Sequence, residues 1–265
     1  MYNYQLLTNH VVELSKTIGQ FLLTEIKTLQ QSDVEEKGVH NLVTYVDKLA
    51  EKQIVKALSV LIPESGFIAE EGTSNKVGEI YNWIVDPLDG TTNYIHGVPL
   101  YSVSIALKMN EELVLGVIYE PNLDECFSTW KGAPSYLNGK EIRVSSMQTI
   151  DHALFATGFP YYDYSRLDNF LKFFAYLMQN SRGVRRLGSA AVDLAYVACG
   201  RYEGFYEYGL SPWDVAAGIL LVQNAGGKII DFSGEQNFLF GKEIIATNSS
   251  VSKEFLTIFK EIFLA

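Results

Sequence analysis

One stretch, Trp83 to Tyr94, constrains the fold of this 265-residue chain more than any other; it reads Trp-Ile-Val-Asp-Pro-Leu-Asp-Gly-Thr-Thr-Asn-Tyr. Its three bulky apolar residues predict a buried strand, and Asp86-Pro87 is expected to end that strand because proline cannot donate to a sheet ladder. Proline also fixes its own φ, and Gly90 accepts backbone conformations that other residues resist. The sequence therefore predicts a tight turn directly after a buried strand.

Two carboxylates and two hydroxyls meet at this turn. Asp86 and Asp89 repel each other when both are ionised, and a proton or a cation between them removes that cost. Together with the hydroxyls of Thr91 and Thr92 they offer oxygen ligands, which favour Mg²⁺, Mn²⁺ or Ca²⁺ over zinc. The alternative is that the aspartates only cap backbone groups, as they do in many Asp-Gly turns. The complete run favours a cation site.

An alternative to the cation site is that the first aspartate is a covalent nucleophile. Asp-x-Asp-Gly-Thr after a hydrophobic strand would suggest a phosphatase that uses its first aspartate as nucleophile. In this chain the two carboxylates are three residues apart, with a proline between them. This spacing favours a metal-bridging turn over alternate positions along a strand end.

The composition is that of an acidic globular protein. Hydrophobic residues make up 48% of the chain, close to the globular average. The length suits one large domain or two intimate lobes. The formal net charge of −10 works against binding to nucleic acid or to anionic membrane, although metal ions can still provide positive charge for a phosphate. We therefore expect no direct nucleic-acid partner and no membrane partner.

Several features indicate a cytoplasmic protein. Cys126 and Cys199 are far apart in the sequence and give no disulfide framework, which suggests a reducing compartment. The amino terminus lacks a basic region followed by an apolar run, and no stretch approaches about 18 consecutive apolar residues. The histidines have no zinc-ligand spacing, and no glycine-rich nucleotide loop with its lysine is present.

The first half of the chain, to about residue 148, predicts two helices packed on a largely antiparallel sheet. Apolar residues recur at steps of three and four in the helical segments, and they alternate with small or polar residues in the strands. The expected helices are Tyr4–Gln30 and Thr44–Ile62, with a loop over Ser32–Asn41 between them. Besides the strand at Trp83, the expected strands are Gly66–Ala69, Tyr101–Met109, Leu113–Glu120, Asp124–Trp130 and Ile142–Val144.

From about residue 149, strand and helix patterns alternate. The expected elements are strands at Ala153–Gly158, Val184–Leu187 and Tyr202–Tyr208, and helices at Ser165–Gln179, before Cys199 and at Pro212–Val222. No repeat or flexible linker separates the halves. We therefore expect a single domain, residues 1–265, whose two lobes, about 1–148 and about 149–265, share one interface.

Polar residues at the ends of these elements are further candidates for a site. Asp47 falls in the first turn of a helix, where an acidic residue also simply meets the helix dipole. Glu70 follows a strand and precedes the central turn closely, although glutamates are usually solvated. Gly188–Ala190 opens a helix and exposes N–H groups that would accept an anion or a hydroxyl, although close packing explains these residues equally well. Asp214 opens another helix, and Glu207 lies on a strand.

These segments together resemble the inositol monophosphatases, within the wider superfamily of Mg²⁺-dependent, lithium-sensitive phosphatases. The likeness covers nearly the whole chain, and it is far more specific for the superfamily than for the substrate. The stretch Gly200–Glu207 looks most like the bacterial members. The other matching stretches are Asn41–Asp47, Phe67–Glu71, Trp83–His96, Arg186–Asp193, Trp213–Gly218 and Ala225–Gly227.

The resemblance implies an α+β fold, a layered α/β/α/β/α sandwich of the sugar phosphatase type represented by fructose-1,6-bisphosphatase. It implies one catalytic domain over residues 1–265, two or three Mg²⁺ ions, inhibition by Li⁺ and a homodimer. The implied reaction is hydrolysis of inositol monophosphate to inositol and phosphate. A metal-activated water would attack the phosphoryl group directly, without a covalent intermediate.

Carried over position by position, the resemblance implies the metal ligands. Glu70, Asp86 and the carbonyl of Leu88 would hold one Mg²⁺. Asp86, Asp89 and Asp214 would hold a second.

The resemblance also implies catalytic and substrate-binding roles. Asp47 would support a weaker third ion or its waters, while Glu70 and Thr91 would orient the attacking water. The residues implied to contact the substrate are Asp89, Gly90, Thr91, Gly188, Ser189, Ala190, Glu207 and Asp214.

The substrate itself stays open among small phosphorylated polyols and sugars. Glu207 favours a polyol because a carboxylate accepts hydrogen bonds from vicinal hydroxyls. Fructose 1,6-bisphosphate, histidinol phosphate and nucleotide phosphates are alternatives, since a second phosphate could pair with one of four arginines. These are Arg182, Arg185, Arg186 and Arg201. A regulatory binding role on the same fold, as in bacterial relatives that act in transcription complexes, is an alternative of another class.

Overall fold

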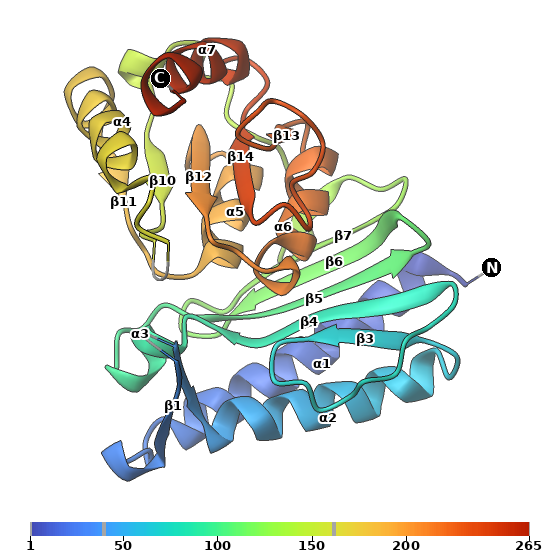
Figure 1. Cartoon of the computed structure of the whole chain (residues 1–265). Helices are drawn as coiled ribbons and strands as arrows, with labels where there is room; N and C mark the ends of the chain where they lie inside the picture. The colour runs from blue at the N-terminus through green and yellow to red at the C-terminus, as the bar shows by residue number, and fades with distance from the viewer. Residues whose placement is uncertain (1, 39–40, 161–162, 265) are drawn as a thin grey trace.

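Five layers of helices and strands build the fold (Figure 1). The figure shows the computed structural model of the chain, which describes residues 2–38, 41–160 and 163–264. From bottom to top the layers are α1 (Tyr4–Glu25) with α2 (Tyr45–Leu61), a large sheet, α5 (Ala190–Ala198) with α6 (Pro212–Asn224), a smaller sheet, and α4 (Leu167–Asn180) with α7 (Ser252–Phe263). This order confirms the expected α+β class and the α/β/α/β/α layering.

The large sheet has the strand order β3-β4-β5-β6-β7-β8-β9. Only β3 and β4 pair in parallel among the described strands of this sheet, so the prediction of a largely antiparallel sheet is confirmed. Its strands are β3 (Gly66–Ala69), β4 (Tyr81–Asp89), β5 (Ser102–Met109), β6 (Glu112–Glu120), β7 (Glu125–Trp130), β8 (Ser135–Leu137) and β9 (Lys140–Ile142).

The smaller sheet is mixed, with the strand order β11-β10-β12-β14-β13. β10 pairs in parallel with β11 and β12, whereas β14 is antiparallel to β12 and β13. Its strands are β10 (Phe155–Thr157), β11 (Val184–Arg185), β12 (Gly204–Tyr208), β13 (Lys228–Ile230) and β14 (Glu243–Thr247).

Three apolar clusters fill the spaces between the layers. The amphipathic helices α1 and α2 cover one face of the large sheet, and α4 and α7 cover the outer face of the smaller one. Helices α5 and α6 are apolar on nearly every side, and such helices belong in an interior. They lie between the two sheets, so one cluster joins both halves of the chain.

The contact of α6 with the large sheet depends on a glycine. A Cβ on Gly116 of β6 would lie 2.9 Å from the carbonyl oxygen of Ala217 on α6. A backbone atom cannot move aside as a side chain can, so a larger residue at Gly116 would separate the helix from the sheet. Because α6 also carries Asp214, this close approach fixes the depth of one candidate site residue.

The central strand departs from the prediction that Asp86-Pro87 ends it, because β4 continues to Asp89. Asp86 and Asp89, three residues apart, pair with residues only two apart on β5. The extra residue makes a bulge, which tolerates Pro87 because the ladder is already interrupted there. The predicted tight turn follows one residue later at Gly90, whose φ is 101°.

Two local predictions on the first half were also wrong. The segment predicted as a loop forms a short 3₁₀ turn, η1 (Gln31–Asp33), and an antiparallel pair, β1 (Val34–Gly38) and β2 (Asn41–Thr44). Residues 39 and 40 of that predicted loop lie outside the described residues. The strand expected at 142–144 is instead β9, which ends at Ile142. Polar strands such as β1 carry no apolar alternation, and for this reason pattern analysis missed them.

Most other elements begin or end within a few residues of the predicted positions, with α1 ending earlier, at Glu25. The strands β8, β13 and β14, the helix α7 and the short helix α3 (Thr91–Ile95) were not predicted. Among the described helices none is both long enough and apolar enough to span a membrane.

We expect Phe255→Ala in α7 to lower the free energy of unfolding by about 3–5 kcal/mol, because it leaves a cavity in a dense core. The Phe255 ring is fully buried, and its centroid lies 5.2 Å from those of Phe155 and Phe173. Urea denaturation measures the effect. As a control, Thr257→Ala on the exposed face of α7 should change stability by less than about 0.5 kcal/mol. Equal effects of the two substitutions would contradict a core role for α7.

Candidate functional site

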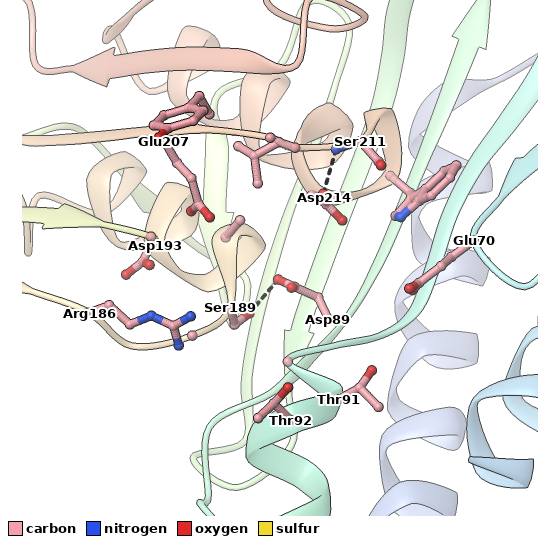
Figure 2. A pocket seen from close by; sticks show the side chains of 18 of the residues that line it. Glu70, Asp89, Thr91, Thr92, Arg186, Ser189, Asp193, Glu207, Ser211 and Asp214 are labelled. Atoms are coloured by element: carbon pink, nitrogen blue, oxygen red, sulfur yellow. Dashed lines mark hydrogen bonds between the residues drawn. The ribbon is translucent and has the colours of Figure 1, made fainter. Parts of the chain in front are cut away.

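A cavity of about 280 Å³ opens where β3, β4 and β12 end and where α5 and α6 begin (Figure 2). It gathers segments that are far apart in the sequence. The predicted site residues that line it are Glu70, Asp89, Gly90, Thr91, Gly188, Ser189, Ala190, Glu207 and Asp214. Asp47, Asp86 and Leu88 are buried and are not among the lining residues.

Acidic side chains dominate the site. Burial raises the pKa of Asp86 well above its usual value, and repulsion from Glu70, Asp89 and Asp214 raises it further. Burial and repulsion from Asp89 likewise raise the pKa of Asp214 well above its usual value. Burial raises the pKa of Asp89 to about 6, although hydrogen bonds from Ser189 and the start of α5 oppose the shift. The cluster therefore favours any ligand that brings positive charge.

Hydrogen bonds orient two of these carboxylates across the layers. One oxygen of Asp89, Oδ2, accepts bonds from the Ser189 hydroxyl at 2.6 Å and the Ala191 N–H at 2.8 Å, so α5 fixes the end of β4 (Figure 2). The Oδ2 atom of Asp214 accepts the Ser211 N–H at 2.7 Å within a capping box that opens α6. Each aspartate is thus held by a helix N-terminus in the middle layer.

Asp86 is oriented within the bulge of β4, because its Oδ1 atom accepts the Leu88 N–H at 2.9 Å. The hydroxyl of Thr91 lies 3.0 Å from both the Leu88 carbonyl oxygen and Oδ1 of Asp47. A hydroxyl has one hydrogen, so Thr91 donates to one of these two acceptors at a time. The backbone that carries the predicted metal ligands is therefore fixed by short local bonds.

Asp47 combines a helix cap with a link to the site. Its Oδ2 atom accepts the N–H of Thr44 at 2.9 Å and the Thr44 hydroxyl at 2.7 Å, which completes a capping box at the start of α2. Burial raises the pKa of Asp47, while the bonds from Thr44 and Thr91 oppose that shift. The structure thus shows the helix-cap role, and it adds a contact with Thr91 on the cavity wall.

The donor set fits a hard divalent cation. Only oxygen atoms are offered, several of them from buried carboxylates that repel one another, and such sites suit Mg²⁺. Within the described part of the chain, no three His, Cys, Asp or Glu side chains form a ready-made metal cluster. The assignment of ligands to individual ions therefore stays a prediction.

The inner wall of the cavity adds residues that the sequence-based site did not include. Asp193 is fully buried, and its two carboxylate oxygens have no hydrogen-bond partner among the described residues. Burial and repulsion from Glu207 raise its pKa well above the usual value. Asp193 lies in the stretch Arg186–Asp193, which resembles the inositol monophosphatases. It was not predicted as a site residue because the helix around it is apolar, as expected of a core helix.

Glu207 owes its position to a glycine. A Cβ on Gly158 would lie 1.9 Å from the Glu207 carboxyl carbon, so a side chain at position 158 would clash with this carboxylate. Burial raises the pKa of Glu207 to about 8, while the charge of Arg186 opposes the shift. Arg186 is the one basic side chain among the described residues that line the cavity.

The layered fold and its carboxylate-lined cavity together define a phosphatase of the layered α+β type. More particularly, the chain belongs to the inositol monophosphatase family, whose family model matches residues 3–262. It is a family of metal-dependent phosphatases, typically with Mg²⁺.

Individual relatives agree with this assignment but carry two kinds of name. The Nus factor SuhB of Pseudomonas aeruginosa is 43% identical over 258 residues, which cover 96% of this chain and 95% of the relative. The inositol-1-monophosphatase of Mesorhizobium japonicum is 40% identical over 256 residues, or 96% of each chain. The crystal structure of the extragenic suppressor protein suhB of Bartonella henselae superposes with a TM-score of 0.91 at 38% identity, over 97% of this chain and 99% of that one.

Without divalent cations, we expect the protein to lose stability as the pH rises from about 5 to about 8. Folding raises the pKa of Asp89 to about 6 and that of Glu207 to about 8. In this interval the folded state keeps protons that the unfolded state, with carboxyl pKa values near 4, has released, so stability falls with pH. Melting temperatures recorded in EDTA across this range measure the effect.

The substitution Glu207→Gln should flatten the upper part of this pH dependence, because it removes a carboxyl whose pKa is raised to about 8. Glu261→Gln, at an exposed position of α7, is the control and should leave the slope unchanged. A wild-type melting temperature that increases between pH 6 and about pH 8 in EDTA would contradict the direction of the shift.

Proposed function

We propose that this protein is a Mg²⁺-dependent phosphomonoesterase that hydrolyses inositol monophosphate to inositol and phosphate. The observation that carries the proposal is the convergence of Glu70, Asp89 and Asp214 on one cavity, opposite the polar wall around Glu207. Glu70 follows β3, Asp89 ends β4 and Asp214 lies in the first turn of α6, so three separate elements deliver these side chains to the cavity. Membership of the inositol monophosphatase family supports the reaction class.

These carboxylates, together with Asp86 and the Leu88 carbonyl, supply the proposed Mg²⁺ sites. Glu70, Asp86 and the Leu88 carbonyl would hold one ion, and Asp86 with Asp89 and Asp214 would hold a second. Bound there, Mg²⁺ would lower the pKa of a water and neutralise charge that develops on the phosphoryl and leaving oxygens.

The other proposed roles belong to the chain itself. Glu70 and Thr91 orient the attacking water, and Thr91 can do so because its own hydrogen is directed to Asp47 or Leu88. When the Thr91 hydroxyl donates to either oxygen, its lone pairs can accept a hydrogen from water. Asp47 steadies Thr91 and would support a weaker third ion or its waters.

The proposed phosphate site is the turn after β4. The N–H groups of Gly90 and Thr91 stand at the start of α3, where the first N–H groups of a helix have no intrahelical partner. A Cβ on Gly90 would lie 3.1 Å from the Gly188 carbonyl oxygen, so glycine lets the β4 turn and the α5 loop approach each other. The phosphate and the leaving alcohol would therefore lie between these two segments.

The alcohol side of the proposed site is formed by the start of α5 and the end of β12. Gly188, Ser189 and Ala190 would face inositol hydroxyls together with Asp89 and Asp214. The Glu207 carboxylate accepts hydrogen bonds, as vicinal hydroxyls require. This wall supports a polyol as the leaving group.

Other phosphate esters are the nearest alternatives for the same chemistry. Arg186 on the cavity wall could pair with a second phosphate, which fructose 1,6-bisphosphate would bring. A nucleotide phosphate is another alternative. Histidinol phosphate is a third alternative. Arg201 contributes less to this choice because it is not among the residues that line the cavity; its guanidinium pairs with Glu125 and lies over the ring of Tyr196.

A regulatory role is a second candidate, favoured by the relatives named Nus factor SuhB. The acidic cavity supports catalysis, but a second role on another surface is compatible with it. A pull-down with RNA polymerase tests this role, and a pull-down that recovers no polymerase would contradict it. The homodimer implied by the resemblance and the cytoplasmic location expected from the sequence stay predictions, and light scattering of the purified protein would test the dimer.

We expect Mg²⁺-dependent phosphate release to be faster from myo-inositol 1-phosphate than from fructose 1,6-bisphosphate, histidinol phosphate or a nucleotide 3′-phosphate. EDTA should abolish the release, and Li⁺ should inhibit it. Preference for another ester would retain the metal chemistry and overturn the substrate. No release from any of the four esters would overturn the enzymatic proposal.

We expect Asp89→Asn and Asp214→Asn each to lower kcat by at least about 100-fold, because each removes a charge that would bind the metal ion. Circular dichroism should show an intact fold in both variants. Asp168→Asn, at an exposed position of α4, is the matched control and should keep wild-type turnover. Wild-type turnover in either site variant would contradict the two-ion assignment.

A further inference from the structure

We propose that Glu51 is a positioning residue that fixes the turn carrying Glu70 and thereby sets the affinity of the site for Mg²⁺. Glu51 lies on α2 and is fully buried. Its carboxylate accepts three hydrogen bonds, all from the turn that follows β3. The Oε2 atom accepts the Glu71 N–H at 2.7 Å, and Oε1 accepts the N–H of Thr73 at 2.8 Å and its hydroxyl at 2.7 Å.

These bonds complete the hydrogen bonding of the backbone N–H groups in the turn. The Gly72 N–H donates to the Ala69 carbonyl at 3.3 Å, and the Glu70 N–H donates to the Val85 carbonyl at 3.2 Å. Every backbone N–H from residue 70 to residue 73 therefore has an acceptor, and the two shortest of these four bonds end on Glu51. The direction in which Glu70 leaves the backbone is thus set by a side chain from another layer.

Glu70 needs such an anchor because of charge repulsion. Its carboxylate repels that of Asp86, and this repulsion acts before any cation is bound. A turn held only by its own bonds could relax and carry Glu70 away from the cavity. The Glu51 carboxylate opposes this movement because it accepts three bonds of 2.7–2.8 Å from the turn. Glu51 therefore preorganises the site for a cation.

The helix α2 holds the ends of two neighbouring strands. Asp47, four residues before Glu51 and on the same face of the helix, binds Thr91 after β4. Glu51 binds the turn after β3, and β3 runs parallel to β4, with Ala69 opposite Val85. Because Asp47 and Glu51 are one helical turn apart on α2, they set the relative position of the ends of β3 and β4.

The chain contains a closely matched control in Glu120, at the end of β6. Its side chain is fully buried as well. One oxygen accepts the Leu123 N–H at 2.6 Å, and the other accepts the N–H of Asn122 at 3.1 Å and its side-chain amide at 2.6 Å. This pattern repeats that of Glu51, but Glu120 is not among the residues that line the cavity.

The test compares Glu51→Gln with Glu120→Gln. In each variant an amide N–H₂ group replaces an acceptor oxygen and meets a backbone donor, so both variants should lose melting temperature to a similar extent. Isothermal titration calorimetry on the metal-free protein measures the Kd for Mg²⁺. We expect it to weaken by roughly 10–100-fold in Glu51→Gln, as for the outer-shell partners of metal ligands in general, and to stay at the wild-type value in Glu120→Gln.

Kinetics provide a second readout, and here the inference rests on the proposed function. In Glu51→Gln the Mg²⁺ concentration for half-maximal activity should rise, while KM for the phosphate ester at saturating Mg²⁺ should stay unchanged. If Glu51→Gln does not fold, Thr73→Val takes its place. It removes one of the three bonds and is expected to weaken Mg²⁺ binding by a smaller factor.

The outcomes separate the two proposals. Equal Mg²⁺ affinity in the wild type and in Glu51→Gln, or in Thr73→Val where that variant replaces it, would overturn the role of Glu51 and leave the proposed function standing. A loss of affinity shared by Glu120→Gln would likewise overturn it, because general destabilisation would then explain the effect. A wild-type protein that binds no Mg²⁺ and hydrolyses no ester would overturn the proposed function, and this inference with it.

Discussion

Repulsion among buried carboxylates at the end of β4 is the constraint on which the site depends. Asp86 and Asp89 lie on β4 and Asp214 lies on α6; Asp89 and Asp214 raise the pKa of Asp86, and Asp89 raises that of Asp214. Such a cluster would move apart unless the backbone were fixed on every side. Hydrogen bonds from the first turns of α5 and α6 provide that restraint, as do those to Asp47 at the start of α2.

The layered architecture explains how one cavity receives all of these restraints. Helices α5 and α6 lie between the two sheets, so their first turns point to the edge where β4 and β12 also end. From the opposite face of the large sheet, α2 reaches the same edge through Asp47 and Glu51. The apolar clusters thus determine where the polar groups meet, and short hydrogen bonds then determine how they are oriented.

How far the site could be predicted depended on how local its signals are. Asp86, Asp89, Gly90 and Thr91 are adjacent in the sequence, and their spacing alone predicted a turn rich in oxygen atoms. Glu51 and Asp193 carried no comparable signal, because Glu51 is one of several charged residues in an amphipathic helix and Asp193 lies within an apolar one. The donors that bind Glu51 and the carboxylates near Asp193 are distant in the sequence, so only the folded chain brings them together.

The sequence by itself determined the alternation of helices and strands, the oxygen-rich turn and the likeness to the inositol monophosphatases. Periodicity and turn chemistry act over a few residues, and for this reason they can be read from the chain alone. Only the tertiary structure decided that β4 passes Pro87 as a bulge, that β13, β14 and α7 complete the smaller sheet and its cover, and that α2 braces Glu70. Each of these features depends on partners distant in sequence, and it is packing that brings those partners together.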